Sequence, residues 1–231
     1  MRCVIISISR WACASVTPGF KRVANFLAPT IPISMPALMQ RANRALDFAA
    51  VAFDLFARRG IGQATMDDIA AEGRATKGSL YWHYRSKDEV ILAACRYYYQ
   101  KWHKDTQRNI ASVSDPVEKI RITVRNSVRS CLIDEQNRGF TMEILTRSLY
   151  DKPTREGWLQ FFEGVRAFYL ALVEAAIEAR SLKCADPARA VDLMLSSMEG
   201  YKLRAVFEPA LCSKPEEAAI TKQLLALLNI A

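Results

Sequence analysis

Histidine is scarce in this chain, with only His83 and His103, and the six cysteines include no C-x-x-C pair. Structural zinc and iron–sulfur sites need several such ligands at short, regular spacing. We therefore expect no metal site and no cofactor. Scattered cysteines are typical of free thiols in a reducing cytoplasm, and we expect the protein to be cytoplasmic.

Catalytic patterns are missing as well. Residues 106–231 contain no glycine-rich phosphate loop, no strand-like alternation and no plausible triad. A nucleophile or general base needs a positioned partner, and neither histidine nor any cysteine has an evident one. No stretch of about twenty apolar residues occurs, so we expect no membrane-spanning helix. We predict no catalytic residues.

Positive charge is concentrated toward the start of the chain. The formal net charge is +8, but residues 106–231 carry 17 cations against 16 acids. Residues 1–35 carry no acid and four cations, Arg2, Arg10, Lys21 and Arg22. A basic front and a near-neutral back fit a DNA-binding head on a body that binds something else.

Two short helices joined by a tight turn are predicted within residues 65–84. Thr65 and Asp68 have the spacing of a capping box, so they predict the start of the first helix. Met66, Ile69 and Ala70 then form one apolar stripe at helical spacing.

The second helix is expected to begin at Thr76, with Leu80 and Tyr84 pointing inward. Between Gly73 and Lys87 the chain has four cations and no carboxylate, which favours phosphate contacts. This is the helix-turn-helix arrangement, in which the second helix enters the major groove.

Several of these residues, in this order, resemble the DNA-binding signature of TetR-family (tetracycline-repressor-like) transcriptional regulators. They are Thr65, Ile69-Ala70, the run Lys77 to Tyr84, and Ser86-Lys87, within a signature spanning Arg41 to Lys101. The family's turn usually carries Ala-Gly, whereas the matching positions here are Gly73 and Arg74. We therefore expect a non-glycine residue in the left-handed conformation, at a modest cost.

Residue types and resemblance together predict contacts with a double-stranded DNA operator. The predicted contact residues are Thr65, Thr76, Lys77, Gly78, Ser79, Tyr81, Trp82, His83 and Lys87. Lys77 and Tyr81 would contact bases or backbone, while Thr65, His83 and Lys87 would hold phosphates.

The expected fold is all-α, with a three-helix head and a larger helical body. We predict three parts: residues 1–35, a head at 36–105 that includes the start of a linking helix, and a body at 106–231. Residues 1–35 read either as an over-extended start, with Met35 or Met39 as the alternative, or as a disordered basic arm. The first helix is expected at 41–59, with Leu46, Ala49, Ala50, Phe53 and Phe56 on its inner face.

Capping patterns predict the later helices. Ser86 to Glu89 reads as a capping box for a helix reaching residue 107. Asp115-Pro116, Asp186-Pro187 and Ser213 with Glu216 read as further starts. Body helices are expected at 116–134, 139–150, 154–180, 187–207 and 215–229. The helices at 154–180 and 187–207 are apolar on most sides, which favours a homodimer interface of four helices. The resemblance implies the same.

The resemblance also implies a small-molecule effector held among the body helices. The candidate contacts are Trp102, Arg125, Arg129, Phe140, Glu143, Arg147, Trp158 and Phe162. The favoured hypothesis is a dimeric, ligand-responsive repressor that binds a palindromic operator and is released by its effector. Two alternatives stay open: a constitutive architectural DNA-binding protein that senses nothing and, least favoured, an all-helical enzyme.

Overall fold

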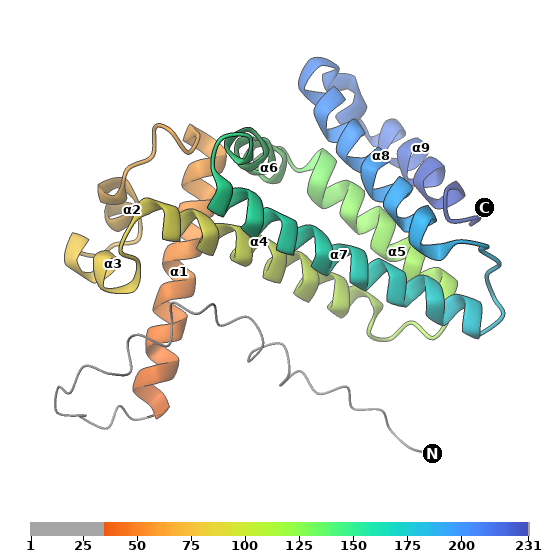
Figure 1. Ribbon diagram of the computed structural model, residues 1–231, viewed down its shortest axis with the longest axis horizontal. Helices are drawn as coiled ribbons and strands as arrows, with labels where there is room; N and C mark the ends of the chain where they lie inside the picture. The colour runs from red at the N-terminus through yellow and green to blue at the C-terminus, as the bar shows by residue number, and fades with distance from the viewer. Residues whose placement is uncertain (1–34, 231) are drawn as a thin grey trace. The chain divides into compact units, whose positions relative to one another are not determined.

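The computed structural model describes residues 35–230, with side chains from Arg41 onward, and the described part of the chain contains helices and no strands (Figure 1). This confirms the expected all-α class. The predictions made for residues 1–34 lie outside the described residues. Residues 41–231 form one compact unit, and the side-chain contacts described below lie within it.

The head is built from the first three helices: α1 (Met35–Arg59), α2 (Met66–Glu72) and α3 (Lys77–His83). α1 begins six residues before the predicted start at Arg41. Phe53 and Phe56 are fully buried, as expected for core residues. Leu46 was wrongly placed on the inner face: it is 45% exposed, because burial along α1 begins only at Phe48.

α4 (Lys87–Ile110) connects the head to the remaining helices. Those elements are α5 (Pro116–Val128), the π-helical turn η3 (Arg129–Ile133), α6 (Glu135–Ser148), α7 (Lys152–Glu178), α8 (Pro187–Phe207), the 3₁₀ turn η4 (Pro209–Cys212) and α9 (Lys214–Ala226). α7 packs against α4, α5, α6 and α8, and α9 packs against α5 and α8 (Figure 1).

The predicted aspartate caps are confirmed: Asp115 accepts from the Val117 N–H, and Asp186 from the Arg189 N–H. The helix expected at 139–150 begins four residues earlier, because Asp134 caps it through the Asn137 N–H. The helix expected at 116–134 is α-helical only to Val128 and continues as η3.

Two predicted caps differ in detail. Ser86 caps α4 through the Glu89 N–H, but the Glu89 carboxylate accepts from the Arg85 N–H rather than closing the box on Ser86. Ser213 precedes α9 without a side-chain capping bond.

Buried apolar residues form two cores. The first joins the head to the start of α4 and also takes Phe140 and Ile144 from α6 and Trp158 from α7. The second lies among the body helices and includes Trp102. Residues from the predicted body therefore complete the core of the head. The division at residue 105 stays a prediction.

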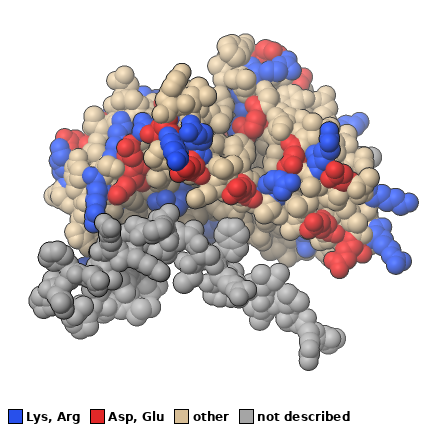
Figure 2. All heavy atoms as spheres, viewed as in Figure 1, with Lys and Arg blue, Asp and Glu red and all other residues tan. Residues whose placement is uncertain are grey.

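Within residues 35–230, no helix has the length and apolar character needed to span a membrane. Over the same range, no group of three or more potential ligands could hold a metal ion. Cys95, Cys131, Cys184 and Cys212 are free thiols. Cations and carboxylates are interspersed on the face of the molecule drawn in Figure 2.

Candidate nucleic-acid interface and effector cavity

Thr65 and Asp68 form the predicted capping box at the start of α2. The Thr65 hydroxyl accepts from the Asp68 N–H at 3.1 Å, and the Asp68 carboxylate accepts from the Thr65 N–H at 2.8 Å. The Thr65 hydroxyl also donates to that carboxylate at 2.6 Å, and these bonds hold the pKa of Asp68 below its usual value. The hydroxyl is thus engaged within the protein, so a phosphate contact would require it to exchange partners.

The turn after α2 uses Gly73 and Arg74 for different purposes. Arg74 has φ 49°, the left-handed conformation expected at this non-glycine position. Gly73 has an ordinary φ of −74°, but a Cβ there would lie 3.0 Å from the Ile69 carbonyl oxygen and 3.1 Å from the Phe48 ring. Glycine is therefore needed for the close approach of α1 to the turn. Arg44 completes the contact by donating to the Gly73 carbonyl at 2.9 Å.

α3 is anchored on one side and open on the other. Leu80 is fully buried, and the Tyr84 hydroxyl donates to the Ala45 carbonyl of α1 at 2.8 Å, so both predicted inward anchors are confirmed. Lys77, Gly78, Tyr81 and Trp82 are all exposed. Their spacing of one, four and five residues places them on a single face of the helix. This face is the candidate DNA-reading surface.

The Thr76 hydroxyl borders that surface, and the Lys77 ammonium is part of it. Thr76 caps α3 through the Ser79 N–H at 3.2 Å, so the structure uses its oxygen at the helix start. The Lys77 ammonium lies 2.8 Å from the Asp67 carboxylate, which raises the pKa of Lys77. Both side chains are more than half exposed, so this ion pair contributes little to stability and can be exchanged for a DNA contact.

Gly78 is exposed to solvent, and no contact within the protein requires a glycine at this position. A Cβ at this position would meet only the Thr76 hydroxyl, at 3.9 Å, and its φ is not in the left-handed region. Packing within the protein therefore does not require glycine here. A missing side chain in the centre of an exposed helical face permits close approach of another molecule.

His83 lies at the edge of the surface and is half-buried. The centroid of its ring is 5.6 Å from that of Phe48 and 4.7 Å from that of Trp82, which it meets edge-on. Burial, together with the nearby Arg44 and Arg41 guanidiniums, lowers the pKa of His83. The imidazole is therefore neutral at pH 7 in the free protein. The Arg41 guanidinium lies over the Trp82 ring at 4.5 Å.

Lys87 is the first residue of α4. It is half-buried, and its pKa is lowered by burial and by Arg147. The neighbouring first-turn residues are the acids Asp88 and Glu89. A phosphate at this helix terminus would therefore be held by Lys87 and backbone N–H groups against two nearby carboxylates.

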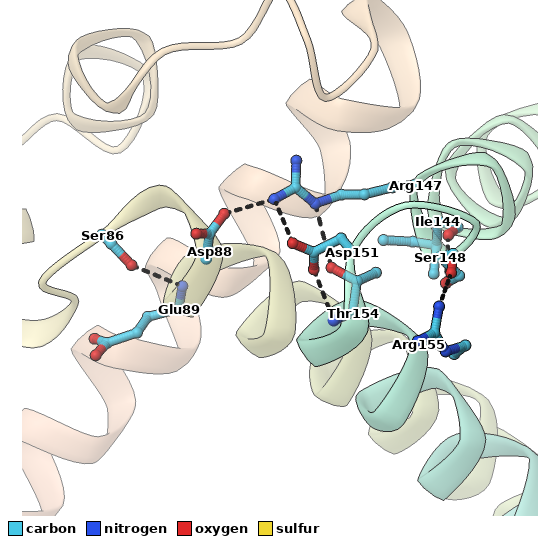
Figure 3. A network of polar contacts seen from close by, with 9 residues as sticks. All are labelled: Ser86, Asp88, Glu89, Ile144, Arg147, Ser148, Asp151, Thr154 and Arg155. Carbon is cyan, nitrogen blue, oxygen red and sulfur yellow. Dashed lines mark hydrogen bonds and ion pairs between the residues drawn. The ribbon is translucent and has the colours of Figure 1, made fainter.

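Two of the predicted effector contacts instead join the head to the body. Arg147 of α6 bonds to Asp88 of α4 at 2.7 Å and to Asp151 and Thr154 at the start of α7 (Figure 3). The Glu143 carboxylate accepts from the Ile61 N–H at 2.7 Å, in the loop between α1 and α2. Gly60, with φ 80°, leaves room for that carboxylate. These contacts link α6 to the start of α4, the start of α7 and the loop before α2.

The other predicted effector contacts are distributed over separate places. Phe140 and Trp158 are buried in the first core, and the Trp158 indole N–H has no hydrogen-bond partner. Arg125 and Arg129 are exposed and line an outer groove of about 630 Å³ between α5 and α9, where Arg129 pairs with Glu217. Trp102 and Arg129 also line a polar cavity of about 280 Å³.

Only Trp102 and Phe162 of the eight line a small cavity of about 20 Å³ in the body. It lies among α4, α5, α7 and α8, and its lining also includes residues that were not predicted: Ser127, Cys131, Tyr169, Glu199 and Lys202. The Trp102 indole N–H donates to the Ser127 hydroxyl at 3.0 Å, and the Tyr169 hydroxyl donates to the same oxygen at 2.7 Å.

A sequence signal for this cavity was present in α8. Val191, Met194, Met198 and Ala205 lie at helical spacing on the buried face, and Lys202 interrupts that apolar stripe. Lys202 is only 2% exposed, and its ammonium lies 2.7 Å from the Glu199 carboxylate. The Tyr98 hydroxyl lies 3.4 Å from the thiol of Cys131, another residue of the lining. Burial raises the pKa of Tyr98 well above its usual value.

Comparison with known proteins agrees with the geometry of the head. The model of bacterial regulatory proteins of the tetR family matches residues 49–94. The repressor KstR2 from Mycolicibacterium smegmatis is 32% identical over 94 residues, which cover 41% of this chain and 43% of that protein. The chain spans less than half the length of the curated relatives it matches.

Solved structures share the fold over a longer stretch. A TetR regulator from Haloarcula marismortui has a TM-score of 0.70 at 15% identity, covering 81% of this chain and 97% of that one. The SmeT–triclosan complex has a TM-score of 0.64 at 24% identity, covering 81% and 90%. The family consists of regulatory proteins rather than enzymes, as the sequence led us to expect. Over residues 49–94 the chain is therefore similar to the tetR family of bacterial regulatory proteins, and its helical fold is shared with solved TetR regulators.

Proposed function

We propose that the protein is a dimeric, ligand-responsive transcriptional repressor that binds a palindromic operator and is released by a small-molecule effector. The observation that carries the proposal is the outer face of α3, where Lys77, Gly78 and Tyr81 are exposed over the buried anchor Leu80. A lysine and a tyrosine on a rigid helix suit base and backbone contacts in the major groove. DNA binding fits the expected cytoplasmic location.

Phosphate contacts would fix the orientation of α3 without reading sequence. We assign them to Thr65, Thr76, Ser79, His83 and Lys87, with Trp82 packing at the edge of the backbone. Arg41 over Trp82 adds a cation to that edge. Residues 36–105 are the proposed DNA-binding part, and residues 106–231 the effector-binding and dimerisation part.

Dimerisation is supported by apolar side chains left exposed on α8. Leu193, Leu203, Val206 and Phe207 are each more than half exposed, and Leu159 of α7 is too. A second copy packed on this face would form a four-helix interface. Two heads in one dimer can then read two half-sites about one helical turn apart.

An effector can release DNA only if it binds one arrangement of the two heads more tightly than the other. The cavity is lined in part by α7, which packs against α6, and Arg147 and Glu143 of α6 contact the start of α4 and the loop before α2, so this chain of contacts supports a link between the two sites. SmeT, whose fold this chain shares, has been solved with triclosan bound. This supports a small-molecule effector rather than an architectural protein that senses nothing.

The test is fluorescence anisotropy of the full chain with a labelled duplex from the DNA upstream of its own gene. A scrambled duplex of the same length is the control, and both are titrated at two salt concentrations. We expect selective binding with two chains per site, because dimeric heads read paired half-sites. Equal binding to both duplexes, lost equally at higher salt, would support the architectural alternative instead.

A further inference from the structure

Among the described residues, Lys202 is the one lysine, arginine, aspartate or glutamate that is buried. It lies on the buried stripe of α8, is 2% exposed, and has Glu199, one turn earlier, as its ion-pair partner. The contact distance is 2.7 Å, yet Oε2 of Glu199 is buried without a hydrogen bond. The pair is therefore held by charge without good hydrogen-bond geometry, and both groups retain unused bonding capacity.

The two members of the pair differ in their access to water. Glu199 is 29% exposed, and it lines the small cavity as well as an outer groove of about 470 Å³ between α7 and α8. Its carboxylate can turn toward that groove and stay solvated. Lys202, by contrast, is only 2% exposed. A buried ammonium without a partner is strongly unfavourable, so any ligand that displaces Glu199 has to supply a negative charge.

The rest of the cavity lining is mainly apolar. Besides Ser127, Cys131 and Tyr169, it consists of Trp102, Phe161, Phe162, Val165, Leu195 and Met198. A cationic ligand would place a second positive charge beside Lys202, and a neutral one would leave the weak pair as it is. An acid with an apolar body satisfies both the lysine and the surrounding side chains.

We propose that the effector of this protein is an amphipathic carboxylic acid whose carboxylate replaces Glu199 as the partner of Lys202. Its aliphatic or aromatic part lies among Phe161, Phe162 and Met198. This proposal rests on the proposed function, because it specifies the ligand class of the same regulator.

Binding must widen the cavity, since about 20 Å³ cannot hold such a molecule. The outward turn of Glu199 frees the volume of its side chain. Met198 is unbranched and adapts its shape more easily than the aromatic residues. Phe162 and Leu195 separate the cavity from the outer groove, because they line both, and their movement would connect the two spaces.

The first experiment measures ligand binding to the full chain without DNA. Octanoate and phenylacetate are compared with octanamide, phenylacetamide and octylamine by thermal shift and calorimetry. The acids have the charge that Lys202 needs, whereas the amides keep the shape and remove the charge. We expect at least one acid to raise the Tm and to bind about tenfold to a hundredfold more tightly than its amide, the range of a charge-assisted hydrogen bond.

Two variants assign that binding to the ion pair. Lys202→Met should abolish the preference for the acid over the amide, while Lys222→Met, which removes an exposed cation of α9, should keep it. Glu199→Gln should tighten acid binding, because the competing carboxylate is gone. The Glu199→Gln result also decides the matter if Lys202→Met fails to fold.

The proposal is overturned if neither acid binds better than its amide, or if Glu199→Gln weakens acid binding. Because these measurements contain no DNA, such a result would leave selective operator binding untouched. If the anisotropy titration showed no selective binding to the operator duplex, that would contradict the proposed function. The acid-binding result would not be affected.

Discussion

Two lysine–carboxylate pairs of nearly equal length lie in opposite surroundings. In the head, Lys77 and Asp67 are 2.8 Å apart and both are more than half exposed. In the body, Lys202 and Glu199 are 2.7 Å apart, and the lysine is almost completely buried. Water can replace either partner of the first pair at little cost, so DNA can do so as well. The second pair can exchange its carboxylate only for another anion.

Under the proposed function, one kind of contact serves two purposes. An exposed pair adds little stability and keeps a cation available at a reading surface. A buried pair restricts what can enter a cavity, because a wrong ligand leaves an unpaired charge.

The largest effect is expected on stability. Glu199→Ala leaves Lys202 buried without a partner and should lower the free energy of unfolding by about 2–4 kcal/mol. Asp67→Ala removes the equivalent carboxylate from Lys77 at the surface and should change it little, since exposed pairs contribute little. Urea unfolding of both variants measures the difference. Equal losses would mean that burial does not distinguish the two pairs.

The second prediction concerns reading by α3. Lys77→Ala and Tyr81→Ala should each weaken operator binding about tenfold to a hundredfold, because each removes a proposed base or backbone contact. Lys222→Ala, on α9, is the matched control for lost positive charge and should bind as the wild type does. Anisotropy at constant salt provides the affinities. If both α3 variants bind normally, α3 is not the reading helix.

The third prediction concerns the turn that positions α3. Arg74→Gly should raise the free energy of unfolding by about 1 kcal/mol or less, because glycine adopts φ 49° without strain but gains freedom in the unfolded chain. Gly73→Ala should lower it, because the new Cβ would lie 3.0 Å from the Ile69 carbonyl oxygen. Thermal unfolding of the two variants is the measurement, and effects of reversed sign would contradict the assigned roles.

The smallest effect is a pH dependence of DNA binding. The pKa of His83 is lowered by burial and by Arg44 and Arg41, so the free protein carries a neutral imidazole at pH 7. A phosphate beside it would raise that pKa in the complex, so binding would take up a proton. Affinity should therefore rise modestly as pH falls from 7.5 toward 6 at constant ionic strength. His83→Gln should flatten this dependence, and an unchanged slope would remove His83 from the interface.

Local signals made the turn of the head and several helix starts predictable. The caps at Thr65, Thr76, Asp115 and Asp186 depend on residues two or three positions away, and each forms the expected bond. The left-handed conformation of Arg74 was predicted because this chain has Gly73-Arg74 where the TetR-family turn usually has Ala-Gly. Such features need no knowledge of distant parts of the chain.

The body was less predictable because its contacts join residues far apart in sequence. Glu143 and Arg147 look like inward polar residues in the sequence, but their partners Ile61 and Asp88 lie 82 and 59 residues away. The cavity around Lys202 also depends on four separate helices. Its one local signal was a lysine on an apolar stripe, which sequence reasoning overlooked.

Hydroxyl-radical footprinting of the full chain on its operator tests the central claim most directly. A dimer that presents two α3 helices should protect two half-sites on one face of the duplex, with centres about ten base pairs or a multiple of that apart. Tyr81→Ala should remove both protected regions at the same protein concentration. A single protected region, or uniform protection that survives this substitution, would contradict reading of a palindromic operator by paired helix-turn-helix heads.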